Sequence, residues 1–225
     1  MTSGFRLLAL VALGSAGVTT GLAAQVAGLP VRNAGVGTGI GISLDAGFPN
    51  ADAGKGFALG ATGALGLGPL GVTASLSRYD PKAAEAVWSA GGTANLKVFG
   101  GPLIPLSVTV QAGAGRTSQD TGAPNFPVSI RTWHVPVGVG VALTIPNPVF
   151  AIKPWLAPRL DLARITIESD TPAETHTDTN FGISGGVDLG FLSGLSVRVM
   201  YDRVMAGDGV HPSVLSIGVG FRVGT

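Results

Sequence analysis

Residues 104–115, IPLSVTVQAGAG, place an apolar side chain at every second position and a small residue, a polar residue or Pro105 between them. A period of two is the period of a β-strand, so this stretch predicts a strand with one apolar face and one small or polar face. Its length suits a tilted strand that crosses a bilayer, which takes about 9 to 11 residues.

The same alternation recurs along most of the chain. It predicts strands at residues 36–48, 57–67, 72–79, 90–99, 104–115, 133–144, 150–167, 181–189, 195–202 and 215–223. In the 150–167 strand we expect a shift of register near Arg164, because Ile165 and Ile167 have the parity opposite to that of Leu160.

The connections between these strands alternate between long polar segments and tight turns. The long ones are residues 49–55, 80–88, 117–127, 168–180 and 206–212, and the tight ones are 68–71, 100–103, 146–148 and 192–194. This alternation predicts an all-β fold, an up-and-down antiparallel transmembrane β-barrel of about ten strands, with about eight or twelve as alternatives. The long loops are then outside the cell and the tight turns in the periplasm.

The N-terminus has a different character from the rest of the chain. Residues 1–24 contain Arg6, an apolar run at 7–18 and small residues before a cut after Ala23 or Ala24, which predicts a secretory signal peptide. We expect a short linker at residues 25–34 and the barrel at residues 35–225.

Composition excludes several other classes of protein. Of the 225 residues, 45% are hydrophobic and only 12% charged, whereas soluble domains carry about 25% charged residues. The absence of cysteine excludes a lipoprotein anchor and a disulfide framework. The net charge of +1 comes with Arg6 in the signal peptide, so the mature chain is neutral and nucleic acid is not an expected partner.

Residues 35–223 resemble the small outer-membrane β-barrel proteins of the opacity/OmpA-type family. The features that carry the resemblance are the signal peptide, strands with inward glycines such as residues 182–190 (GISGGVDLG), and a last amphipathic strand that holds Phe221. The resemblance implies a non-enzymatic protein of the bacterial outer membrane, with a structural or surface-interaction role or a narrow passive pore. The partners it implies are outer-membrane lipid and lipopolysaccharide, the barrel-assembly machinery, and an extracellular partner reached through the long loops.

Parity places a set of charged side chains inside the barrel: Asp45, Lys97, Lys153, Arg159, Asp161, Asp188, Arg198, Asp202 and Arg222. We interpret them as an ion-pair network, because about ten strands enclose little more than a packed interior. A narrow solute pathway is the alternative, since the many inward glycines leave room for water. If residues 192–194 form a hairpin loop with Gly194 at positive φ, Asp188 lies opposite Arg198, and we expect these two to form an ion pair.

The sequence leaves three further alternatives open. An outer-membrane enzyme resembling the omptin proteases or the lipid-A deacylases could use rim residues, for which the candidates are Glu174, His176, Asp178, Asp208 and His211. The acids Glu168, Asp170, Glu174 and Asp178 could bind Ca²⁺. A soluble lipocalin-like barrel would turn its apolar faces inward and leave a glycine-rich exterior. We favour a solvated surface loop, with no catalytic residue, cofactor or metal site.

Overall fold

The computed structural model describes residues 26–82, 84–101, 104–123, 126–168, 173–206 and 209–224, and its chain is almost entirely β-strand. The elements are β1 (Gly39–Pro49), η1 (Ala51–Ala53), β2 (Gly56–Leu67), β3 (Leu70–Pro81), β4 (Val87–Phe99), β5 (Leu106–Ala123), β6 (Phe126–Leu143), β7 (Ile145–Pro146), β8 (Phe150–Glu168), β9 (Glu174–Phe191), β10 (Leu195–Met205) and β11 (Ser213–Val223). The expected signal peptide, residues 1–24, lies outside the described residues. In the described part no helix has the length and apolar character needed to cross a membrane.

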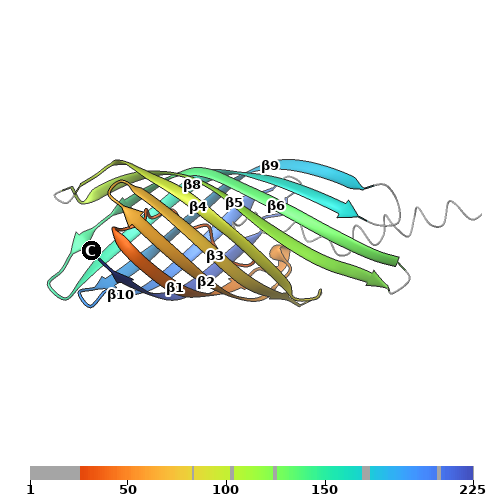
Figure 1. Ribbon diagram of the computed structural model, residues 1–225, viewed down its shortest axis with the longest axis horizontal. Helices are drawn as coiled ribbons and strands as arrows, with labels where there is room; N and C mark the ends of the chain where they lie inside the picture. Colours follow the sequence, from red (N-terminus) through yellow and green to blue (C-terminus); the bar gives the residue numbers. More distant parts are fainter. Residues whose placement is uncertain are drawn as a thin grey trace, which may run out of the picture.

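The strands form one closed antiparallel barrel (Figure 1). Each long strand pairs with its neighbours in sequence, β6 pairs directly with β8 past the two-residue β7, and β1 pairs with β11 to close the wall. The result is the expected up-and-down barrel of 10 strands. The tight turns and the C-terminus lie at one end, here named the turn end, on the left of Figure 1, and the other end is named the loop end.

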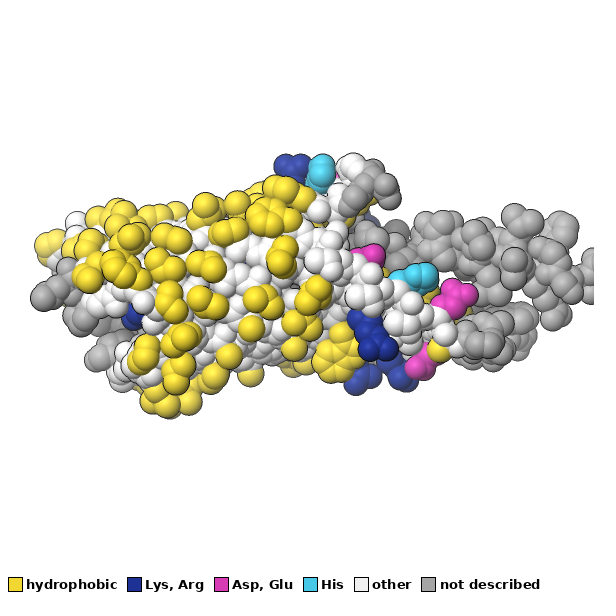
Figure 2. Space-filling model, turned by 90° about the horizontal axis from the view of Figure 1, so that it is seen from above, with side chains coloured by type: hydrophobic (Ala, Val, Ile, Leu, Met, Phe, Trp, Pro, Cys, Tyr) yellow, Lys and Arg dark blue, Asp and Glu magenta, His cyan; other side chains and the backbone are white. Residues whose placement is uncertain are grey.

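The alternation of side chains gives the wall its two faces. Ile42 and Leu44 on the outer face are 66% and 62% exposed, whereas Asp45 on the inner face is 6% exposed. Hydrophobic side chains are spread over the barrel wall, while charged ones gather toward the loop end (Figure 2). An aromatic pair marks each end of the belt. The ring centroids of Phe48 and Phe57 lie 5.5 Å apart at the loop end, and those of Phe150 and Phe191 lie 6.4 Å apart at the turn end. This is the distribution that a bilayer with two interfaces selects.

Two segments expected to be long loops are largely strand. The predicted loops at 117–127 and 168–180 are wrong in extent, because β5 continues to Ala123 and β9 begins at Glu174. Outside the bilayer both faces of a strand contact water, so the apolar alternation stops although the strand does not. Threonine favours extended backbone, which fits the Thr-rich start of β9.

The register shift expected near Arg164 does not occur. Arg164 pairs with Trp133 and Ile165 with Thr132, and the register between β8 and β6 is the same on both sides of these pairs. Ile165 therefore keeps the parity of the lumen face, and Arg164 takes the outer face. Beyond the lipid an outward arginine contacts water, so no shift is needed to accommodate it.

A segment that precedes β1 lies inside the barrel, and we name it the plug (residues 26–38). Its first residues lie beside Ser89 at the loop end, and its last lie beside Gly66 at the turn end. The predicted first strand at 36–48 therefore begins too early, because Val36 packs against Gly71 inside the barrel and β1 starts at Gly39. The segment expected to be a linker, residues 25–34, supplies much of the plug.

The apolar outer face predicts that the folded protein needs detergent or lipid, because its exposed side chains form a surface far larger than the few hundred Å² that soluble monomers tolerate. Unboiled and boiled samples should migrate differently on a denaturing gel, since a closed barrel resists unfolding by detergent alone. A monomer that stays folded and soluble without detergent would contradict this expectation.

Candidate functional site: the occupied lumen

Inward glycines of the wall seat the backbone of the plug. A methyl group added at Gly66 would overlap the carbonyl oxygen of Gly37, and one added at Gly140 would overlap that of Asn33. Glycine is the residue that permits such a close approach of two backbones. The space that these inward glycines leave is thus occupied by the chain itself.

Apolar side chains of the plug complete three small clusters with the wall, which together extend along the lumen. Their members are Val26, Leu29, Ala58 and Tyr79; Val31, Ala53 and Val214; and Ala34, Ala142, Trp155, Ala157 and Met200. Each cluster contains at least one plug residue, so the plug supplies the apolar partner that the wall lacks. Burial of this kind is the main favourable contribution to packing, at about 25 cal/mol per Å².

Polar groups of the wall pair with the backbone of the plug. These hydrogen bonds run from Ala27 N to Ser89 Oγ (3.0 Å), Ser77 Oγ to Ala27 O (2.9 Å), Val31 N to Asp202 Oδ2 (2.9 Å), Lys153 Nζ to Ala34 O (2.6 Å) and Arg222 Nη1 to Gly37 O (2.7 Å). Backbone groups buried in a lumen need such partners, since each unpaired one costs about 1–3 kcal/mol.

Arg159 lies between two carboxylates in the loop-end half of the lumen. Its Nε is 2.9 Å from Asp161 and its Nη2 is 2.8 Å from Asp202, and all three residues are at most 4% exposed. Asp202 also accepts the hydrogen bond from Val31 N, so these three charged side chains connect β8, β10 and the plug. A buried charge set of this kind is costly to break when one partner is removed.

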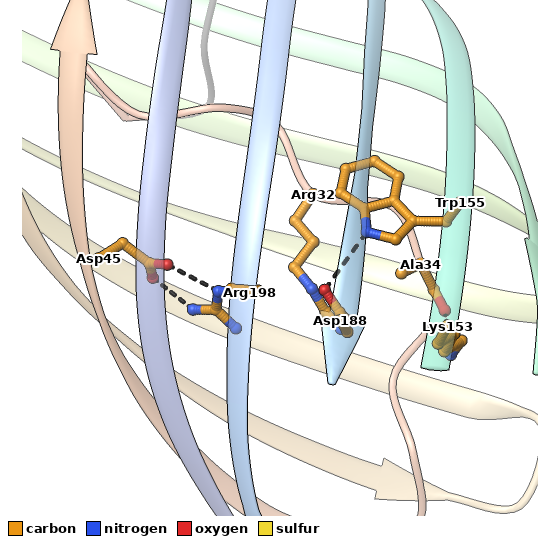
Figure 3. Close-up of polar contacts among 7 residues, drawn as sticks. All are labelled: Arg32, Ala34, Asp45, Lys153, Trp155, Asp188 and Arg198. Atoms are coloured by element: carbon orange, nitrogen blue, oxygen red, sulfur yellow. Dashed lines mark hydrogen bonds and ion pairs between the residues drawn. The ribbon is translucent and has the colours of Figure 1, made fainter. Parts of the chain in front are cut away.

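The pair expected between Asp188 and Arg198 is not formed, although its register is correct. Arg198 lies opposite Asp188 in the β9–β10 ladder, and Gly194 has the expected positive φ of 85°. Arg198 instead donates from Nε to Asp45 Oδ1 over 2.7 Å (Figure 3). Gly218 is the ladder partner of both Asp45 and Arg198, and its missing side chain lets Arg198 reach across β11.

The partner of Asp188 comes from the plug. Arg32 forms an ion pair with Asp188, and the indole Nε1 of Trp155 lies 3.4 Å from the same carboxylate (Figure 3). Sequence reasoning missed Arg32 because its segment has no strand periodicity. The signal that could have revealed it is the combination of several apolar residues and one arginine at 26–36 with a lumen face that is rich in glycine.

Three inward cations have no carboxylate partner in the described part of the chain. Lys97, Lys153 and Arg222 lie close to the turn-end termini of β4, β8 and β11. Lys153 and Arg222 donate to plug carbonyl groups. A cavity of about 600 Å³ lies between the plug and the wall and reaches residues of the tight turns, such as Leu192 and Gly194.

The rim residues considered for catalysis or Ca²⁺ binding are spread over the loop end. Glu174, His176 and Asp178 are exposed along β9. The backbone N of His211 donates to Asp52 over 3.2 Å. Asp170 and Asp208 lie outside the described residues. Within the ranges that the structure describes, no group of three or more potential ligands could hold a metal ion.

Comparison with known proteins gives one family and several similar structures. The family described as "Outer membrane protein beta-barrel domain" matches residues 80–222. No curated protein sequence matches the chain.

Three solved structures illustrate the structural similarity. Ail of Yersinia pestis is 12% identical, with 83% of this chain and 100% of that chain covered and a TM-score of 0.42. Neisserial surface protein A is 16% identical, with 83% and 98% covered and a TM-score of 0.41. The outer membrane protease OmpT of Escherichia coli is 7% identical, with 83% and 94% covered and a TM-score of 0.45.

The ion pairs of the lumen can be tested by double-mutant cycles on unfolding in urea. Arg32→Gln and Asp188→Asn should each lower the free energy of unfolding by about 1–3 kcal/mol, and the double mutant should lose less than the sum because the two side chains interact. The same should hold for Asp45→Asn with Arg198→Gln. A larger coupling between Asp188 and Arg198 than between Asp188 and Arg32 would contradict the observed pairing.

Proposed function

This chain belongs to the outer membrane protein beta-barrel family, and on that premise we propose that it is a non-catalytic outer-membrane protein with two features. Its lumen is closed by its own N-terminal segment, and its loop end contacts partners outside the cell. The observation that carries the first feature is the plug, which occupies the lumen from Ser89 at the loop end to Gly66 at the turn end.

The loop-end half of the lumen supports closure most directly. Val31 packs there with Ala53 and Val214, and Arg159 crosses the lumen between Asp161 and Asp202. A small cavity of about 10 Å³ beside Val31 and Arg159 is too small for a solute path. A passive pore would require the plug to leave these contacts.

The strands that extend past the barrel at the loop end support a role in surface interaction. β10 pairs with β9 only as far as Phe181, so residues 174–180 form a sheet edge that no described strand covers. The backbone N–H and C=O groups of such an edge can pair with an extended segment of another protein. The exposed side chains on this edge are polar or charged, so the edge is well solvated when no other segment pairs with it.

Planar-bilayer conductance tests the closed lumen. The wild-type protein should conduct poorly, whereas Gly66→Ala combined with Gly140→Ala should raise conductance clearly, because each added methyl overlaps a plug carbonyl group. Gly190→Ala is the matched control: Gly190 also lines the lumen cavity, but a methyl there meets nothing within 4 Å. High conductance of the wild-type protein, or equal effects of Gly190→Ala and the double variant, would refute closure by the plug.

Cysteine labelling tests which end faces outward, and the natural chain contains no cysteine to interfere. Thr177→Cys, on the exposed edge of β9, should react with a membrane-impermeant maleimide on intact cells. Ser193→Cys, in the tight turn between β9 and β10, should react only after the outer membrane is permeabilised. The opposite pattern would mean that the loop end faces the periplasm.

A further inference from the structure

The turn-end part of the lumen has more positive than negative charge. Each inward acid lies within ion-pair distance of an arginine: Asp161 and Asp202 of Arg159, Asp45 of Arg198, and Asp188 of Arg32. Lys97, Lys153 and Arg222 then remain without a carboxylate in the described part of the chain. All three project inward near the strand ends that meet the tight turns.

These cations lie close enough to repel one another. Lys153 experiences the charges of Arg32, Lys97 and Arg222, with Asp188 as the one acid that offsets them. The guanidinium groups of Arg222 and Arg32 also interact. A folded chain gains nothing from such repulsion, and inside a low-dielectric wall the repulsion is larger than it would be in water.

The cavity gives a ligand access to this cluster. Its volume is about 600 Å³, and Arg32, Lys153 and Arg222 line it together with turn residues such as Gly194. The cavity is also lined by Asp188, Asp45 and Arg198, so its four cationic side chains exceed its two carboxylates. Sites for small molecules in proteins commonly measure about 300–1,000 Å³. The cavity therefore has room for an anionic group and a small organic part.

Donor groups for an anion are available on these side chains. The Nε of Arg32 is buried and has no hydrogen-bond partner in the described structure. The ammonium of Lys153 has three donors and uses one on Ala34 O. Arginine and lysine together suit phosphate, since arginine offers paired donors and lysine a compact charge.

We propose that this turn-end cavity is a binding site for a phosphate-bearing anion, held by the cationic side chains of Arg32, Lys153 and Arg222 that line it. A phosphate monoester dianion matches the excess of positive charge better than a single carboxylate does. The ligand enters from the side of the tight turns, which in this family of folds is the periplasmic side. The site is independent of the loop-end surface proposed for contact with partners.

Titration calorimetry of the refolded full-length mature protein in non-ionic detergent tests the proposal. Sodium phosphate and glycerol 3-phosphate should both release heat of binding, and binding should weaken as ionic strength rises. Phosphatidylglycerol added to the micelles is the third probe. Binding of the two soluble phosphates supports a soluble ligand, whereas binding of the lipid alone supports a lipid headgroup as the source of the phosphate.

Charge-removing variants give the decisive comparison. Lys153→Met should weaken phosphate binding about tenfold, because it removes one charge from the wall of a partly screened cavity. Lys82→Met is the matched control, since it removes the same charge from an exposed position at the opposite end of the barrel. Arg222→Met is measured as well, in case the first variant folds poorly. Heat-modifiable gel mobility reports the folding of each variant. No binding by the folded wild-type protein, or equal weakening by Lys82→Met and Lys153→Met, would overturn the site.

Discussion

The pairing of β1 with β11 is the interaction on which the rest of the structure depends. A sheet in a bilayer has no water to satisfy the backbone groups at its edges, so it must close on itself. Closure with ten long strands fixes the width of the lumen. Because the inner faces of these strands are rich in glycine, the wall alone does not fill that width, and the plug does.

The plug also organises the charges of the lumen. Arg159 neutralises the loop-end acids only in part, and Asp202 then accepts a hydrogen bond from the plug at Val31. Asp188 is paired by Arg32 of the plug, while Arg198 is directed to Asp45 across the side-chain-free Gly218. The wall and the plug are therefore linked by an ion pair and by charged hydrogen bonds as well as by apolar packing.

The sequence allowed the barrel and its outer face to be predicted, because lipid on one side imposes a period of two on every strand. The tight turn at Gly194 and the register it sets were predictable for the same local reasons. Strand ends beyond the bilayer were not, since water on both faces removes the period. Residues 26–38 were not recognised as a plug because an irregular segment makes contacts that no periodicity encodes. The partner of Asp188 was missed with them.

The plug is joined directly to β1 at Gly39, with no flexible linker between them. It therefore behaves as a ligand that the protein carries at a fixed effective concentration, on the order of millimolar or higher for short tethers. Dilution of the protein in the membrane does not change its occupancy. A free peptide of the same sequence competes poorly against it, because the tethered copy loses little translational entropy on binding. The state of the lumen is thus set by the chain itself and is independent of how many copies the membrane holds.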